Sequence, residues 1–206
     1  MKYLKLVLSG FIIAVAIQCG ICIAISTVVA HLFNNMIINR LFSLGIFKLG
    51  FLQQSKIELN MGEFPDVVLL TNLVGIKITA GLGSLNGSVF FHMKLFSILA
   101  VPLFSFIVGG YLTSKINYMY TWTEVIWAGI GIGVLNSLFL ATMSVTGGST
   151  ASIPIPFIKE SIDITSRFSL IEALYHGFVF GCIFSLIGAW IHRGRIQMKK
   201  MDTHFQ

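Results

Sequence analysis

The sequence predicts an all-α integral membrane protein, a four-helix transmembrane bundle with an extracytoplasmic loop that contains a surface helix and a β-hairpin. Hydrophobic residues make up 55% of the 206 residues and charged residues 11%, whereas a typical soluble domain has about 25% charged residues. A soluble fold of this length cannot bury so much apolar surface, so much of it is expected to face lipid. The composition therefore excludes an ordinary soluble enzyme, a disordered chain and a disulfide-rich secreted module.

Four segments are apolar enough to span a bilayer, which requires about 20 mostly apolar residues. They lie at about residues 6–30, 95–113, 125–145 and 168–191. The first follows Lys2 and Lys5 as a signal peptide would, but it is longer than the usual apolar core of about 7–15 residues, so an uncleaved helix is favoured over a cleaved signal. Together the spans and the loop form a single membrane domain over residues 1–206.

The distribution of basic residues predicts the orientation. Lysines and arginines near the span ends gather on the side that also holds both termini, namely at Lys2, Lys5, Lys115, Arg193, Arg195, Lys199 and Lys200. This places both termini in the cytoplasm of a plasma membrane. The net charge of +6 does not indicate nucleic-acid binding, because no basic run has interleaved aromatic residues outside the tail. The residue usage suits a bacterial protein.

The long loop at about residues 31–94 is expected to be extracytoplasmic and to have structure of its own. The apolar pattern of residues 34–52, interrupted by charged residues and glycines, predicts a helix at the membrane surface. The alternation of apolar and polar residues over 76–80 and 88–95 predicts a β-hairpin with Asn86-Gly87 as its turn, although the glycines also permit a plain loop. A lone hairpin is marginal in water, so it needs the surface helix, the bilayer or a partner. The connection that contains Pro154 and Pro156 is expected to be extended and to complete an extracytoplasmic cap.

Small residues spaced four apart form ridges on the last two spans, which lets helix backbones approach closely. The ridge residues are Gly129, Gly133 and Ser137 on the third span, and Ala173, Gly177, Gly181, Ser185 and Ala189 on the fourth. The ridges predict close packing of these two spans. They suit a homodimer equally well.

Glu172 and His176 are the candidate intramembrane polar site. They are four residues apart, so they share a helix face near the extracytoplasmic end of the fourth span. Ionisable groups within a span are candidates for proton relays or ion ligands. The alternative is that both side chains reach interfacial water or each other. His31 and His92 are near the same surface, but no spacing fixes a metal site, so no metal or cofactor is predicted.

Other polar groups in the spans have structural interpretations. Cys19 and Cys22 have CxxC spacing, but a thiol midway along an apolar helix behaves as a small hydrophobe. Gln18 and Asn136 are expected to form interhelical hydrogen bonds. Glu124 is expected at the start of the third span, with Thr121 or Thr123 as the cap.

No nucleotide-binding loop, zinc-protease helix or nucleophile elbow is present in the sequence, so an enzyme is not expected. The favoured function is an accessory or interaction subunit that presents its extracytoplasmic loop. Its partners are the lipid bilayer and a protein partner or further copies of the chain. The alternative is a small ion- or proton-coupled transporter or channel that uses Glu172 and His176, but transporters usually have more polar residues at mid-membrane depth.

Overall fold

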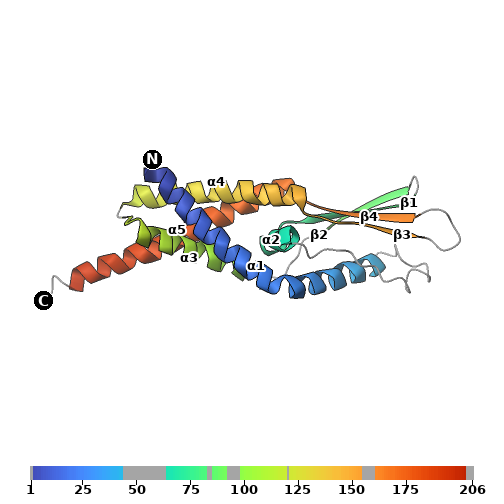
Figure 1. Cartoon of the computed structure of the whole chain (residues 1–206), viewed down its shortest axis with the longest axis horizontal. Coiled ribbons are helices and arrows are strands. Elements are labelled where there is room, and N and C mark those ends of the chain that lie inside the picture. The colour runs from blue at the N-terminus through green and yellow to red at the C-terminus, as the bar shows by residue number, and fades with distance from the viewer. Residues whose placement is uncertain are drawn as a thin grey trace.

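The protein is mostly helical and has one small antiparallel sheet (Figure 1). The computed structural model describes residues 2–43, 64–82, 85–91, 98–119, 121–154 and 161–202. Helices α1, α3, α4 and α5 gather at one end of the molecule and the sheet extends from the other. The elements in chain order are α1 Lys2–Ser43, α2 Phe64–Thr71, β1 Ile76–Leu82, β2 Leu85–Phe91, α3 Ala100–Ile116, α4 Trp122–Thr146, β3 Thr150–Pro154, β4 Ser161–Phe168 and α5 Leu170–Asp202.

Among the residues that the structure describes, three helices are long and apolar enough to cross a membrane, which indicates an integral membrane protein. They are the segments Tyr3–Val29 of α1, Trp122–Thr146 of α4 and Leu170–Ile196 of α5, with hydropathies of 2.5, 1.8 and 1.8. Helix α3 has 17 residues, or about 25 Å at 1.5 Å per residue, less than the hydrocarbon thickness of about 30 Å. Part of the predicted second span, residues 95–97, is outside the described residues. A fourth transmembrane span therefore stays a prediction, although α3 packs against both α1 and α5.

Helix α1 is longer than the predicted first span. It continues without interruption to Ser43, and its second half leaves the bundle and runs in the direction of the sheet (Figure 1). The first ten residues of the predicted surface helix, 34–43, are therefore the end of α1. The remainder of that prediction, residues 44–52, is outside the described residues.

The predicted hairpin is present, but its predicted turn is wrong. Strand β1 pairs with β2 from Ile76 opposite Phe91 to Leu82 opposite Leu85. Asn86 and Gly87 are within β2, and only residues 83 and 84 separate the strands. In the observed register Asn86 is opposite Gly81 and Gly87 is opposite Ala80. Strand β1 also pairs along its whole length with β4, ending with Leu82 opposite Ile162.

The sheet has four antiparallel strands in the order β2-β1-β4-β3. Two of them, β3 and β4, come from the connection between α4 and α5, where the sequence predicted only an extended segment. Pairing of β1 with β4 therefore unites two loops that are far apart in the chain. A sheet of three or more strands with a packed face can be stable where a lone hairpin is marginal.

At the helix end of the sheet, the described side chains of one face are buried in a core that they share with α2. Ile76 and Ile78 of β1 alternate with exposed or half-buried residues, as do Ile164 and Phe168 of β4. These side chains share one core with Val67, Val68, Leu69 and Leu70 of α2 and with apolar residues of the long helices. Helix α2 also packs against α1 and α4, so it joins the sheet to the bundle.

The small residues of α4 and α5 are at close backbone contacts. A Cβ atom on Gly177 would lie 2.7 Å from Ser137 Cα, and one on Gly181 would lie 3.0 Å from Gly133 Cα. The ridge on α5 does not face α4 throughout, because the Ser185 backbone packs against Gly110 of α3. Ala189 is buried beside Ala128 and Val125 of α4. On α4, the atoms nearest to an added Cβ on Gly129 belong to the Leu186 side chain.

Gly177→Ala is expected to lower the free energy of unfolding by about 1–3 kcal/mol, as overpacking of a tight contact does. The new methyl group would push against the Ser137 backbone and force α4 and α5 apart. Thermal unfolding of the purified protein in detergent measures the effect. The control is Gly20→Ala on α1, where no atom is within 4 Å of an added Cβ. Equal stability of the two variants would contradict the packing argument.

Candidate functional site

A carboxylate of α5 holds the start of β1. The Gly75 backbone N–H donates to Glu172 Oε2 at 2.6 Å, and Ser169 N–H donates to the Gly75 carbonyl at 2.9 Å. A Cβ on Gly75 would lie 2.7 Å from the same Glu172 oxygen and 2.6 Å from the Phe90 ring, so only glycine fits without displacement. A hydrogen bond to an ionised acceptor is roughly twice as strong as a neutral one. This contact therefore fixes the sheet to the end of α5.

A second carboxylate holds the turn between α4 and β3. Asp66, in the first turn of α2, is 1% exposed, and its Oδ1 accepts a hydrogen bond of 2.8 Å from Gly148 N–H. Gly148 has a φ of +108°, a conformation that side chains rarely adopt. The chain turns here from the end of α4 into the sheet, and the hydrogen bond to Asp66 holds that turn against α2.

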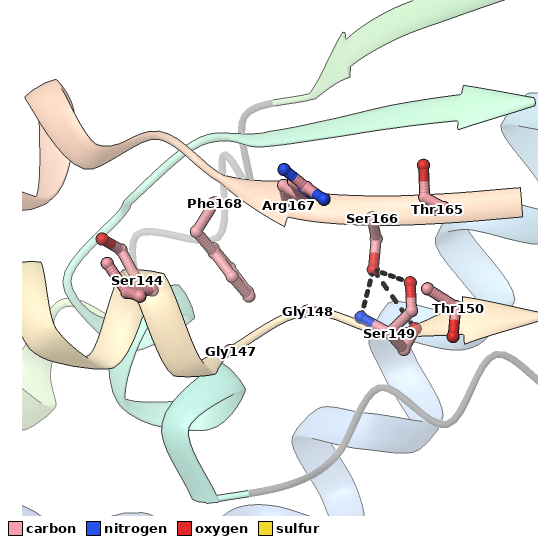
Figure 2. Close-up of a pocket in the computed structure, with 10 residues that line it drawn as sticks. Ser144, Gly147, Gly148, Ser149, Thr150, Thr165, Ser166, Arg167 and Phe168 are labelled. Carbon is pink, nitrogen blue, oxygen red and sulfur yellow. Dashed lines mark hydrogen bonds between the residues drawn. The ribbon is translucent and has the colours of Figure 1, made fainter.

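A cavity of about 500 Å³ lies beside this turn. Figure 2 shows Thr165 and Arg167 on one side of β4, with Ser166 on the other side, toward Ser149. Ser149 N–H donates to Ser166 Oγ at 2.8 Å, and Ser166 Oγ donates to the Ser149 carbonyl at 3.1 Å. The volume is within the usual range of ligand pockets, about 300–1,000 Å³. However, the described residues include no group of three His, Cys, Asp or Glu side chains that would hold a metal ion.

The second face of the sheet, here called the outer face, is polar and exposed. Lys77 and Arg167 are directly opposite each other on β1 and β4, and Phe90 is opposite Lys77 on β2. All three side chains are exposed. Like charges directly opposite in a sheet destabilise it by about 0.2–1 kcal/mol. A negative group above the pair would relieve that repulsion.

A row of hydroxyl groups crosses the outer face next to the cationic pair. The register places one hydroxyl residue from each strand in this row, namely Ser88, Thr79, Thr165 and Thr150. Asp163 and Ser152 form an exposed pair one row farther from the helices. The outer face therefore offers cations at its helix end, then hydroxyls, then a carboxylate.

The two members of the predicted polar site have different surroundings. Glu172 binds Gly75, as described above. His176 stacks on Phe180, with ring centroids 5.5 Å apart, and lies beside Tyr175. Its Nδ1 atom has no hydrogen-bond partner among the described residues. The carboxylate thus contributes to sheet attachment, while the imidazole belongs to an aromatic stack along α5.

The other predicted polar residues are spread along the helices. The predicted interhelical hydrogen bond of Asn136 is confirmed, because its Nδ2 donates to the Gly177 carbonyl at 2.9 Å. That of Gln18 is not, because its buried Nε2 and Oε1 have no hydrogen-bond partner among the described residues. Cys19 and Cys22 are free thiols, and Cys22 Sγ is 3.7 Å from Thr71 Oγ1. His31 is exposed on α1, and His92 is outside the described residues.

The predicted helix start at Glu124 is confirmed. Thr121 is the cap of α4, and it forms a reciprocal capping box with Glu124. The alternative cap, Thr123, is already inside the helix.

The sequence interpretation missed Asp66, Gly75, Gly148 and the opposed Lys77 and Arg167. One signal was available, because residues 162–165 alternate between apolar and polar types as 76–80 do, although Ser166 interrupts the pattern. Comparisons with models of protein families, with curated proteins and with solved structures found no match. The functional argument therefore rests on the geometry of the chain itself.

Glu172→Ala is expected to reduce the free energy of unfolding by about 1.5–3 kcal/mol, because it removes a charged acceptor from the Gly75 N–H. Glu172→Gln is the matched variant, and it should cost less because its amide oxygen still accepts. Chemical denaturation in detergent micelles measures both. An unchanged unfolding midpoint for Glu172→Ala would show that the contact does not stabilise the fold.

Proposed function

We propose that this protein is a non-enzymatic accessory subunit of a plasma membrane that binds a protein partner through the outer face of its sheet. In this proposal α3 completes a four-helix transmembrane bundle, both termini are cytoplasmic and the sheet is extracytoplasmic. The observation that carries the proposal is the exposed, opposed pair Lys77 and Arg167 on a sheet that is fastened to the helices.

The attachment of the sheet to the helices supports binding, because a rigid surface loses little conformational freedom when it docks. The sheet is held at Gly75 by Glu172 and, through the turn before β3, by Asp66. Its buried face packs against α2. The outer face is thus presented in one orientation relative to the bundle.

The chemistry of the outer face favours an acidic polypeptide segment as the partner. Arginine and aromatic residues are common at the energetic centres of protein interfaces, and Phe90, Lys77 and Arg167 form one row. Opposite charge on the partner would speed association and fix its register. The adjacent hydroxyl row supplies both donors and acceptors for polar groups of the same segment.

Transport through Glu172 and His176 has less support. Glu172 accepts a hydrogen bond from the Gly75 backbone N–H at the start of the sheet, so its carboxylate takes part in attaching the sheet to α5. His176 is part of an aromatic stack. Ion or proton flux in proteoliposomes that is lost in a folded Glu172→Gln variant would favour transport over the accessory function.

The topology is tested by cysteine labelling in intact cells, with the three native cysteines replaced by alanine. A cysteine at Ser88 on the outer face is expected to react with an impermeant maleimide without permeabilisation. A cysteine at Gln197, beyond the last candidate span, is expected to react only after permeabilisation. The reverse pattern would place the sheet in the cytoplasm and contradict the proposed orientation.

The partner is tested by photo-crosslinking in cells with benzoylphenylalanine at Thr79, in the centre of the outer face. A discrete protein adduct is expected. The double reversal Lys77→Glu and Arg167→Glu should lower its yield about tenfold, as like-charge juxtaposition across an interface does. Higher salt should lower the yield as well.

Two controls accompany the crosslinking. Lys5→Glu reverses another exposed cation, on α1, and should leave the adduct unchanged. Benzoylphenylalanine at Leu138, an exposed position on α4, should not give the same adduct. A yield that does not respond to the double reversal, or an adduct that is a second copy of this chain, would overturn the proposed partner.

A further inference from the structure

The end of the bundle opposite the sheet carries a group of basic side chains that the proposed function does not use. One basic residue is in the last turn of α3, and three are on the part of α5 beside it. Two aromatic residues contact the three basic residues of α5. We call this set the basic cluster: Lys115, His192, Arg193 and Arg195, with Tyr111 and Trp122.

Aromatic rings position the cations of the basic cluster. The Arg193 guanidinium is 4.2 Å from the centroid of the Trp122 ring. Arg195 is 5.7 Å from the centroid of the Tyr111 ring and donates to its hydroxyl at 3.3 Å. The His192 ring meets the same tyrosine edge to face, with centroids 5.2 Å apart. Cation–π contacts of this kind hold a guanidinium in place and leave its N–H groups able to donate.

Two nitrogen atoms of the cluster are buried without a hydrogen-bond partner among the described residues. They are Arg193 Nη1 and His192 Nδ1. A buried donor that lacks an acceptor is unfavourable, and native proteins rarely leave one unexplained. An acceptor supplied from outside the chain would satisfy Arg193 Nη1, and it would satisfy His192 Nδ1 in the tautomer that carries its proton on that atom.

The charge around His192 favours an anionic acceptor. Lys115 and Arg195 are exposed, and both are near enough to His192 to interact with it electrostatically. Glu124, at the same end of the bundle, accepts from the Thr121 backbone N–H in its capping box. The planar guanidinium group of arginine matches the geometry of the phosphate oxygens, which can accept two parallel hydrogen bonds from it.

We propose that the basic cluster binds the phosphate of an anionic lipid headgroup. The last candidate span ends at Ile196 and α4 begins at Trp122, so the cluster is at the depth where headgroups meet the hydrocarbon core. Basic pockets between transmembrane helices commonly hold such headgroups. A lipid presents its phosphate at this depth at all times, which a free phosphate ion does not.

The test is native mass spectrometry of the purified full chain with added phosphatidylglycerol or phosphatidylcholine. The wild type is expected to retain phosphatidylglycerol in preference to phosphatidylcholine. Arg193→Gln with Arg195→Gln should weaken phosphatidylglycerol retention about tenfold, because the double variant removes both guanidinium groups. Lys2→Gln with Lys5→Gln removes the same charge from α1 and should change retention by no more than about twofold.

Three results would overturn the proposal. Equal losses in the two double variants would indicate diffuse attraction of anionic lipid. Retention that survives in the arginine double variant would exclude the basic cluster. Stabilisation by millimolar inorganic phosphate equal to that by phosphatidylglycerol would assign the site to a free anion.

Folding of the arginine double variant is checked by its thermal unfolding. If it fails to fold, Arg193→Lys with Arg195→Lys replaces it, because lysine keeps the charge but not the planar fork. This variant should still retain less phosphatidylglycerol than the wild type. Retention equal to the wild type would contradict recognition by the guanidinium groups.

Discussion

The pairing of β1 with β4 is the contact on which the rest of the sheet depends. It joins a strand that precedes α3 to one that precedes α5, with Ile76 opposite Phe168 and Leu82 opposite Ile162. Without it, each loop would contribute only a two-stranded hairpin, which is marginal in water. With it, the buried side chains of β1 and β4 form one surface, and α2 covers that surface. The hydrogen bonding continues past the strands, because Ser169 N–H reaches the Gly75 carbonyl.

Two acidic residues attach this sheet by the same physical device. Asp66 and Glu172 are each in the first turn of a helix, where the helix dipole stabilises a carboxylate. Each accepts a hydrogen bond from the backbone of a glycine beside a strand, Gly148 and Gly75 respectively. At both glycines a side chain would collide with neighbouring atoms. The acids therefore have a structural role that explains their presence in an otherwise apolar chain.

Hydropathy was sufficient to find the helices, because the need for long apolar segments is a local property of the chain. The partners of the strands were not predictable in the same way. Residues 162–165 alternate as 76–80 do, but alternation does not tell a strand which other strand it joins. Local turn preference gave the wrong loop at Asn86-Gly87, because the two strands continue pairing past these residues to Leu82 opposite Leu85. Glu172 was expected to act with its helical neighbour His176, yet its partner Gly75 is 97 positions away.

The core that joins sheet and bundle also explains how the short helix α3 fits among longer ones. Ile98 and Val101, at the start of α3, are buried in the same core as Val68 and Ile76. That end of α3 therefore meets protein, because α2 and the sheet cover the bundle there. A helix capped in this way does not need the full thickness of the bilayer to bury its first turn, whereas the exposed apolar residues of α4 and α5 need lipid along most of their length. The sheet and α2 thus complete the core at this end of the bundle.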